Sequence, residues 1–288
     1  MPDAAHTRTV DLLLTALAPM IWGTTYVVTT QMLPGGYPVT LALLRALPAG
    51  MLLLLVVRQL PRGIWWGRIF LLGALNFTLF WICLFIAAYR LPGGVAATVG
   101  AVQPLLVLGL ARVLLGTQLR GLAVAAALLG LAGVALLILG PQATLEPLGL
   151  LAGMGGALSM AMGSVLTRKW QPPVSLLTFT AWQLTAGGLL LLPLALWLEP
   201  PLPPLNGVNL LGLIWLGLIG AALTYFLWFR GLRRVGPSAA SALGFLSPVT
   251  AVVAGWALLG QSLSPLQLGG LALVALSLWL GPRAMRQA

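Results

Sequence analysis

Ten long apolar runs, separated by short connections, constrain this chain more than any other feature. Most approach the roughly 20 residues that an α-helix needs to cross a hydrocarbon core about 30 Å thick. Of the 288 residues, 60% are hydrophobic and 7% are charged, whereas about 25% are charged in a typical soluble domain. The chain is therefore predicted to be an all-α integral membrane protein. The runs are Leu12–Thr30, Val39–Val57, Ile69–Ala88, Val95–Leu115, Leu122–Leu139, Leu148–Leu166, Ser175–Leu198, Val208–Phe229, Ser238–Leu259 and Leu266–Leu280.

The connections are short and rich in residues that end helices. Pro34-Gly35-Gly36 and the stretch 200–204, Pro-Pro-Leu-Pro-Pro, are examples, and such clusters mark turns between helices. None is long enough to form a separate soluble domain. The first run is interrupted by Pro19 and lacks a compact leucine core, so we expect a retained first helix and not a cleaved signal peptide.

Basic residues alternate between the connections in a way that predicts orientation. The formal net charge is +11, but the basic residues are scattered singly or in small groups, which argues against a nucleic-acid surface. Short loops rich in Lys and Arg stay in the cytoplasm. With the N-terminus inside, thirteen of the fifteen basic residues fall on the cytoplasmic side and Arg90 alone falls in a connection on the other. We therefore expect both termini in the cytoplasm and a location in the bacterial inner membrane.

The sequence also repeats itself. An offset of 144 superposes Phe85 on Phe229, Arg90 on Arg234 and Pro104 on Pro248. Because each half then holds five helices, an odd number, the second half must be inverted in the membrane, an arrangement typical of transporters. We expect a tail over residues 1–11, a first repeat over 12–141, a second over 142–282 and a tail over 283–288.

These motifs resemble the EamA-type family of the drug/metabolite transporter superfamily, over nearly the whole chain. The stretches that carry the resemblance are Ile21-Trp22-Gly23-Thr24, Leu44-Arg45-Ala46, Tyr89-Arg90-Leu91, Gln103-Pro104, Gly231-Leu232-Arg233-Arg234-Val235 and Ser247-Pro248. The resemblance implies export of metabolites or amino acids through a central cavity lined by both halves. Within the family, the Trp and Met content is most similar to bacterial aromatic amino-acid exporters of the YddG type. One departure is the lack of a Glu after Leu114-Leu115-Gly116, where Thr117 stands.

Arg45 is the ionisable residue that lies clearly inside a predicted span, and such residues are functional candidates by default. Its planar guanidinium suits a substrate carboxylate. Alternatively, it snorkels to the outer interface or hydrogen-bonds backbone carbonyls freed at helix kinks. Gln183 occupies the equivalent position of the second half.

Aromatic and polar residues within the runs supply further substrate-binding candidates. Aromatic rings suit an apolar or aromatic substrate, although each is also explained by packing, and each polar residue by hydrogen bonds between helices. The paired prolines Pro104 and Pro248 are candidate hinges, because a proline removes one backbone hydrogen bond and bends a helix. The remaining candidates are Trp22, Tyr26, Asn76, Phe80, Trp81, Gln103, Ser159, Trp182, Tyr225, Phe245 and Ser247.

Missing residue types narrow the function. The sole histidine, His6, lies in the predicted tail, and no acid lies deep in a run, so we expect no carboxylate proton relay and a facilitator or exchanger. No cofactor, metal or catalytic motif is present, so we expect no enzyme activity. The leading expectation is an exporter of small metabolites, amino acids first, acting as a single chain. The alternatives are an organic-cation exporter, which would need an acid in the membrane, an organic-anion carrier, which would need a second basic residue, and a subunit that transports nothing.

Overall fold

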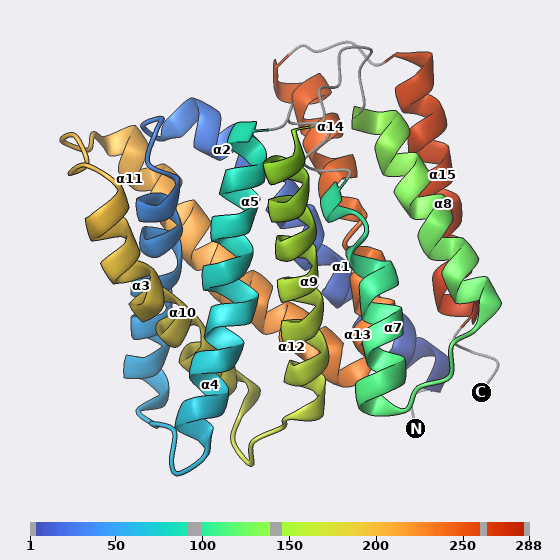
Figure 1. Ribbon diagram of the computed structural model, residues 1–288, viewed down its shortest axis with the longest axis horizontal. Helices are drawn as coiled ribbons and strands as arrows, with labels where there is room; N and C mark the ends of the chain where they lie inside the picture. The colour runs from blue at the N-terminus through green and yellow to red at the C-terminus, as the bar shows by residue number, and fades with distance from the viewer. Residues whose placement is uncertain (1–3, 91–98, 139–145, 260–263, 285–288) are drawn as a thin grey trace.

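The computed structural model describes residues 4–90, 99–138, 146–259 and 264–284 (Figure 1). These four ranges form helices joined by turns and loops, with no strand among them. The all-helical class predicted from the apolar runs is confirmed for this part of the chain. The helices are α1 (Ala4–Gly23), α2 (Thr25–Met32), α3 (Pro38–Val57), α4 (Trp65–Gly73), η1 (Ala74–Thr78), α5 (Leu79–Arg90), α7 (Gln103–Leu115), α8 (Gly121–Ile138), α9 (Pro147–Lys169), α10 (Leu176–Leu198), α11 (Gly207–Ile214), η2 (Trp215–Leu223), α12 (Thr224–Arg234), α13 (Pro237–Leu243), α14 (Leu246–Leu259) and α15 (Pro265–Ala284).

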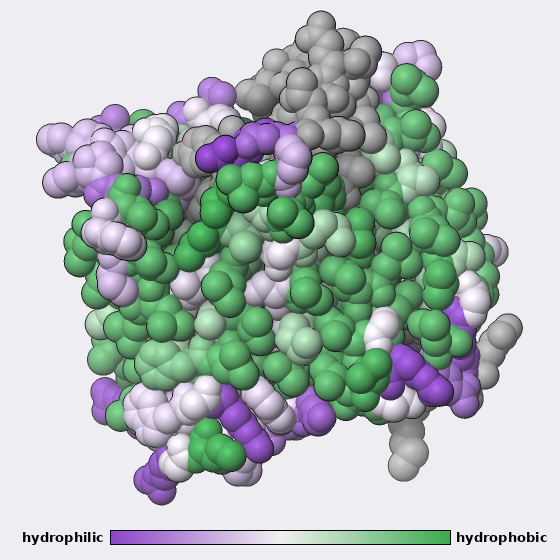
Figure 2. Space-filling model, in the orientation of Figure 1, coloured by the Kyte–Doolittle hydropathy of each residue, from purple (hydrophilic) through white to green (hydrophobic). Residues whose placement is uncertain are grey.

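Seven helical stretches are long and apolar enough to cross a membrane, and they cover seven of the ten predicted runs. Three shorter apolar helices, Gln103–Leu115, Gly121–Leu137 and Pro265–Gly281, cover the other three runs. The run predicted over Val95–Leu115 begins outside the described residues. Figure 2 shows apolar side chains covering the middle of the visible face, with hydrophilic residues at its lower and upper edges. This distribution is the one that a hydrocarbon layer with two wet interfaces requires.

The first helix differs from its prediction. α1 begins at Ala4 and not at Leu12, so most of the predicted polar tail is helical. Asp11 is 6% exposed and pairs with Arg230, while the Thr15 hydroxyl donates a hydrogen bond to the Asp11 carbonyl oxygen at 2.6 Å. The carboxylate of Asp11, in the predicted tail, is paired with a neighbouring helix.

Basic residues gather at one end of the bundle, which we call the basic end. It includes the connection from α3 to α4, with Arg58 and Arg62, and the C-terminal ends of α9 and α12. The start of α1 and the end of α15 lie at this same end (Figure 1). The opposite end carries the exposed ion pair between Arg90 and Glu146, with 2.7 Å between Nη1 and Oε1.

The helices pack in a small number of close pairs. α3 packs along α10, α8 along α15, α5 along α9, and α1 against both α12 and α14. Glycines allow the closest approaches: a Cβ on Gly50 of α3 would lie 2.5 Å from the Thr185 backbone nitrogen of α10. Glu199, just beyond α10, accepts hydrogen bonds at 2.7 Å from the backbone N–H groups of Val39 and Thr40. This carboxylate therefore caps the N-terminus of α3, where negative charge is favourable.

Candidate functional site

Arg45 lies in the middle of the bundle, on the face of α3 that meets η2. Its Nη2 donates a hydrogen bond to the Gly220 carbonyl oxygen at 2.6 Å, and its Cζ lies 5.4 Å from the centre of the Trp81 ring. Its Nε is buried without a hydrogen-bond partner. The sequence left two structural alternatives for Arg45, snorkelling to the outer interface or hydrogen bonding to a backbone carbonyl. The observed contact is the second of these.

The carbonyl of Gly220 that accepts this bond belongs to η2. η2 is a π-helical segment, a form that is rare and frequently found at functional sites. A Cβ on Gly220 would lie 3.5 Å from Nη2 of Arg45, an ordinary van der Waals distance, so Gly220 packs directly against the guanidinium. The Thr224 hydroxyl donates to the same oxygen at 2.8 Å.

Six aromatic residues next to Arg45 form what we call the aromatic cluster. Phe77 lies 5.5 Å from Trp81 and 4.5 Å from Tyr225 between ring centres. Trp22 lies 5.1 Å from Tyr225 and donates a hydrogen bond to the Thr224 hydroxyl oxygen at 2.9 Å. The rings come from both halves of the chain and lie in the largest core cluster of the bundle. Its members are Trp22, Phe77, Trp81, Tyr225, Trp228 and Phe229.

Three buried polar residues that hydrogen-bond to one another, Asn76, Thr167 and Gln183, form a second group. We call them the polar centre, together with Ser164, which precedes Thr167 by about one turn of α9; all four are at most 2% exposed. Asn76 Nδ2 donates to Gln183 Oε1 at 2.8 Å and to the Thr167 hydroxyl oxygen at 3.2 Å. Asn76 belongs to η1, the other π-helical segment. The predicted pair of polar span residues Asn76 and Gln183 is thus brought into direct contact.

The other predicted binding residues divide between this region and the periphery. Phe80 packs against the core that holds the aromatic cluster, and Ser159 donates to the Leu75 carbonyl oxygen at 2.8 Å. Trp182 instead donates to the Gln59 carbonyl oxygen at 2.5 Å, near the basic end. Phe245 packs between α8 and α15, where its ring occupies the space above Gly130. The side chain of Tyr26 lies outside the described residues.

Both candidate hinge prolines follow a break in their helix. Pro104 is in the first turn of α7, directly after a turn at Ala101–Val102. Pro248 is in the first turn of α14, after a turn at Gly244–Phe245. A proline in a first turn removes no intrahelical hydrogen bond, so each begins a new segment and does not kink a continuous one. Gln103 and Ser247 precede them, and a Cβ on Gly23 of α1 would lie 2.5 Å from the Ser247 carbonyl oxygen.

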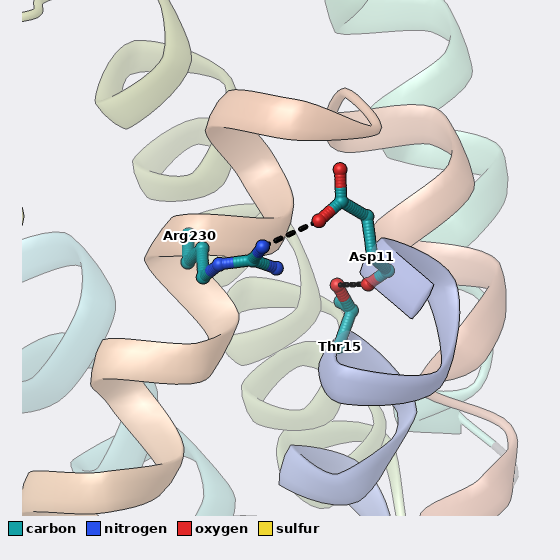
Figure 3. A network of polar contacts seen from close by, with 3 residues as sticks. All are labelled: Asp11, Thr15 and Arg230. Atoms are coloured by element: carbon teal, nitrogen blue, oxygen red, sulfur yellow. Dashed lines mark hydrogen bonds and ion pairs between the residues drawn. The ribbon is translucent and has the colours of Figure 1, made fainter. Parts of the chain in front are cut away.

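Reasoning from the sequence missed the ion pair between Asp11 and Arg230 (Figure 3). It joins α1 to α12 at the basic end, beside a hollow of about 530 Å³ lined by Thr7, Arg8, Asp11, Arg234 and Val235. Arg168 of α9 also donates a hydrogen bond to the Arg233 carbonyl oxygen. The available signal was the position of Asp11, immediately before the first apolar run.

A guanidinium beside an aromatic ring, inside a bundle of helices of membrane-spanning length and composition, indicates a multi-span membrane protein. Comparison with known proteins leads to the same class of protein. The model of the EamA-like transporter family matches residues 10–139 and 147–280. The chain therefore belongs to the EamA-like transporter family and is a multi-span membrane transporter of the drug/metabolite class, as the sequence motifs predicted.

The relatives include proteins from several organisms. The chain is 48% identical over 259 residues to protein PecM of Dickeya dadantii, covering 89% of this chain and 87% of PecM. It is 31% identical over 255 residues to the uncharacterized inner membrane transporter YedA of Escherichia coli K12, covering 86% and 82% of the two chains. A solved crystal structure superposes with a TM-score of 0.83 at 22% identity, covering 96% of this chain and 99% of the other. That likeness concerns the fold alone.

Proposed function

We propose that the protein exports small metabolites, above all amino acids including aromatic ones, across the bacterial inner membrane by alternating access. The observation that carries the proposal is Arg45, a cation in the bundle interior with an unpaired Nε and an aromatic ring beside it. A guanidinium binds a carboxylate, and aromatic faces bind an apolar side chain. An amino acid carries both groups.

The distribution of carboxylates supports an anionic partner for Arg45. Asp11 pairs with Arg230, Glu146 pairs with Arg90, and Glu199 caps α3. Within the described ranges, no protein carboxylate therefore forms a salt bridge with Arg45. An unpaired buried charge is costly, so a substrate carboxylate would relieve that cost. The same distribution argues against an organic-cation site, which would need an acid near the bundle centre.

The packing supports ten crossing helices in two inverted repeats. Exchanging the halves converts the contact of α5 with α9 into that of α12 with α1, and the contact of α7 with α9 into that of α14 with α1. Asn76 in η1 and Gly220 in η2 differ by the repeat offset of 144. Arg45 is the eighth residue of α3 and Gln183 the eighth of α10. Each of these two contacts the π-helical segment of the other half.

The same symmetry supports transport by exchange between two conformations, with Pro104 and Pro248 as hinges at equivalent helix breaks. The basic end would face the cytoplasm. Because the described carboxylates lie near the bundle ends, we propose a facilitator or exchanger without a carboxylate proton relay, acting as a monomer.

Uptake into liposomes that carry the purified protein tests the proposal. Labelled tryptophan, phenylalanine and leucine should enter saturably without a proton gradient, whereas a quaternary ammonium compound should not. Arg45→Ala should lower the initial rate at least about tenfold, equivalent to about 1.4 kcal/mol of lost binding, while the exposed Arg62→Ala should retain the wild-type rate. Uptake of the ammonium compound alone would refute amino-acid transport and favour the cation exporter.

A further inference from the structure

Several hydrogen-bonding groups of the polar centre have no partner. Asn76 Oδ1, Gln183 Nε2 and Ser164 Oγ are buried without a partner, and all three residues are 0% exposed. Leaving a buried polar group without a partner is energetically unfavourable. The centre therefore presents one free acceptor, one free donor and one hydroxyl, which can act as either.

A glycine of α9 makes room for the Asn76 amide. A Cβ on Gly163 would lie 2.1 Å from Asn76 Oδ1, so any other residue at this position would displace the Asn76 amide. Asn76 also sits in a π-helical segment, where the backbone departs from the regular α-helical pattern. Buried polar groups held in place by such features are expected to have a ligand.

The polar centre lies between the aromatic cluster and the basic end. Asn76 is followed directly by Phe77 of the cluster, and Thr167 is in the last turn of α9, at the basic end. A narrow cavity of about 10 Å³ lies beyond Thr167, with Phe179, Phe229 and Arg233 also in its lining. Phe229 belongs to the aromatic cluster. Thr167 therefore joins the polar centre to a cavity near the basic end.

We propose that the polar centre is a loading station that recognises the zwitterionic head of an amino acid before the carboxylate reaches Arg45. The substrate ammonium donates to Asn76 Oδ1, and the substrate carboxylate accepts from Gln183 Nε2, with the Ser164 hydroxyl beside them. The loading station carries no net charge, so it favours a substrate head group whose own charges sum to zero. A bare amine or a bare carboxylate satisfies only one of the two free groups and leaves its own charge uncompensated in a buried site. This inference rests on the proposed amino-acid transport.

Three indole compounds of different charge test the station in liposomes that carry the full chain. They are tryptophan, a zwitterion; tryptamine, a cation; and indole-3-propionate, an anion. Wild-type protein should take up tryptophan at least tenfold faster than either analogue. Asn76→Asp, a nearly isosteric change, adds the missing negative charge and should raise the ratio of tryptamine to tryptophan uptake at least tenfold. Gln183→Glu should shift the ratio in the same direction.

The control is Asn209→Asp, the same chemical change on α11, where the Asn209 side chain caps its helix at the opposite end. Its uptake ratio should equal that of the wild type. A second readout needs only the wild-type protein and does not require any variant to fold. Tryptophan, and not the two analogues, should stabilise the detergent-solubilised wild type against thermal unfolding.

The outcomes separate the two proposals. A wild type that transports tryptophan, together with an uptake ratio unchanged in both acidic variants, overturns the loading station and leaves the proposed function intact. Equal stabilisation of the wild type by all three compounds also overturns the station. A wild type that moves and binds no amino acid overturns the proposed function, and the station with it.

Discussion

The ion pair between Asp11 and Arg230 shows how one buried contact connects distant parts of the chain. Their side chains are 9% and 24% exposed, and the next residue of α12, Gly231, packs against Thr15 so closely that a Cβ would lie 2.3 Å from its methyl carbon. The pair therefore sits at a tight crossing of α1 and α12, where removing one partner leaves the other with little access to water.

We expect Asp11→Asn to destabilise the protein by about 1–3 kcal/mol, because a hydrogen bond to a charged group is lost and Arg230 keeps a poorly solvated charge. Thermal unfolding in detergent measures the change. The control is Glu146→Gln at the exposed pair with Arg90, whose side chains are 39% and 48% exposed; its loss should cost at most about 1 kcal/mol. Equal effects of the two substitutions would show that burial does not strengthen the pair between Asp11 and Arg230.

Among the helices, α8 and α15 form the edge pair of the bundle (Figure 1). Two consecutive glycines of α15 differ sharply in their surroundings. A Cβ on Gly270 would lie 2.7 Å from the Gly133 carbonyl oxygen of α8, whereas a Cβ on Gly269 would meet no atom within 4 Å. Small residues let membrane helices approach closely, and packing is what holds such helices together.

Gly270→Ala should therefore separate α15 from α8 and lower the unfolding temperature. Gly269→Ala should leave that temperature unchanged or raise it slightly, since alanine is the better helix former by about 1 kcal/mol. Thermal unfolding of the two purified variants, side by side, makes the comparison. A decrease for both variants, or for neither, would contradict the close crossing of these helices.

For the whole molecule, the segregation of basic residues at one end predicts the orientation in the membrane. Cys83 is the single cysteine of the chain, so a Cys83→Ser background allows one reporter cysteine at a time. In intact bacterial cells, a membrane-impermeant maleimide should label Pro203→Cys, in the connection before α11, and should not label Arg62→Cys, at the basic end. Both positions are exposed. Labelling of Arg62→Cys alone would reverse the proposed orientation, and labelling of both would contradict it.

The two halves of the molecule carry different residues at one pair of equivalent positions. The Arg45 contact with η2 and the Gln183 contact with η1 occupy equivalent positions, yet one is charged and the other neutral. The equivalent positions of the two halves therefore differ in charge, although each contacts the π-helical segment of the other half.

The sequence by itself determined the membrane class, the apolar runs, the family and the isolation of Arg45 within a run, because each depends on composition or on order along the chain. Only the tertiary structure decided which side chains meet. Trp22 and Trp182 looked equivalent as span aromatics, but Trp22 joins the aromatic cluster and Trp182 bonds to Gln59. The physical reason is that helices apolar on all sides carry little amphipathic signal. Their contact faces are selected by shape, through close approaches such as that at Gly50, and by the few buried polar bonds.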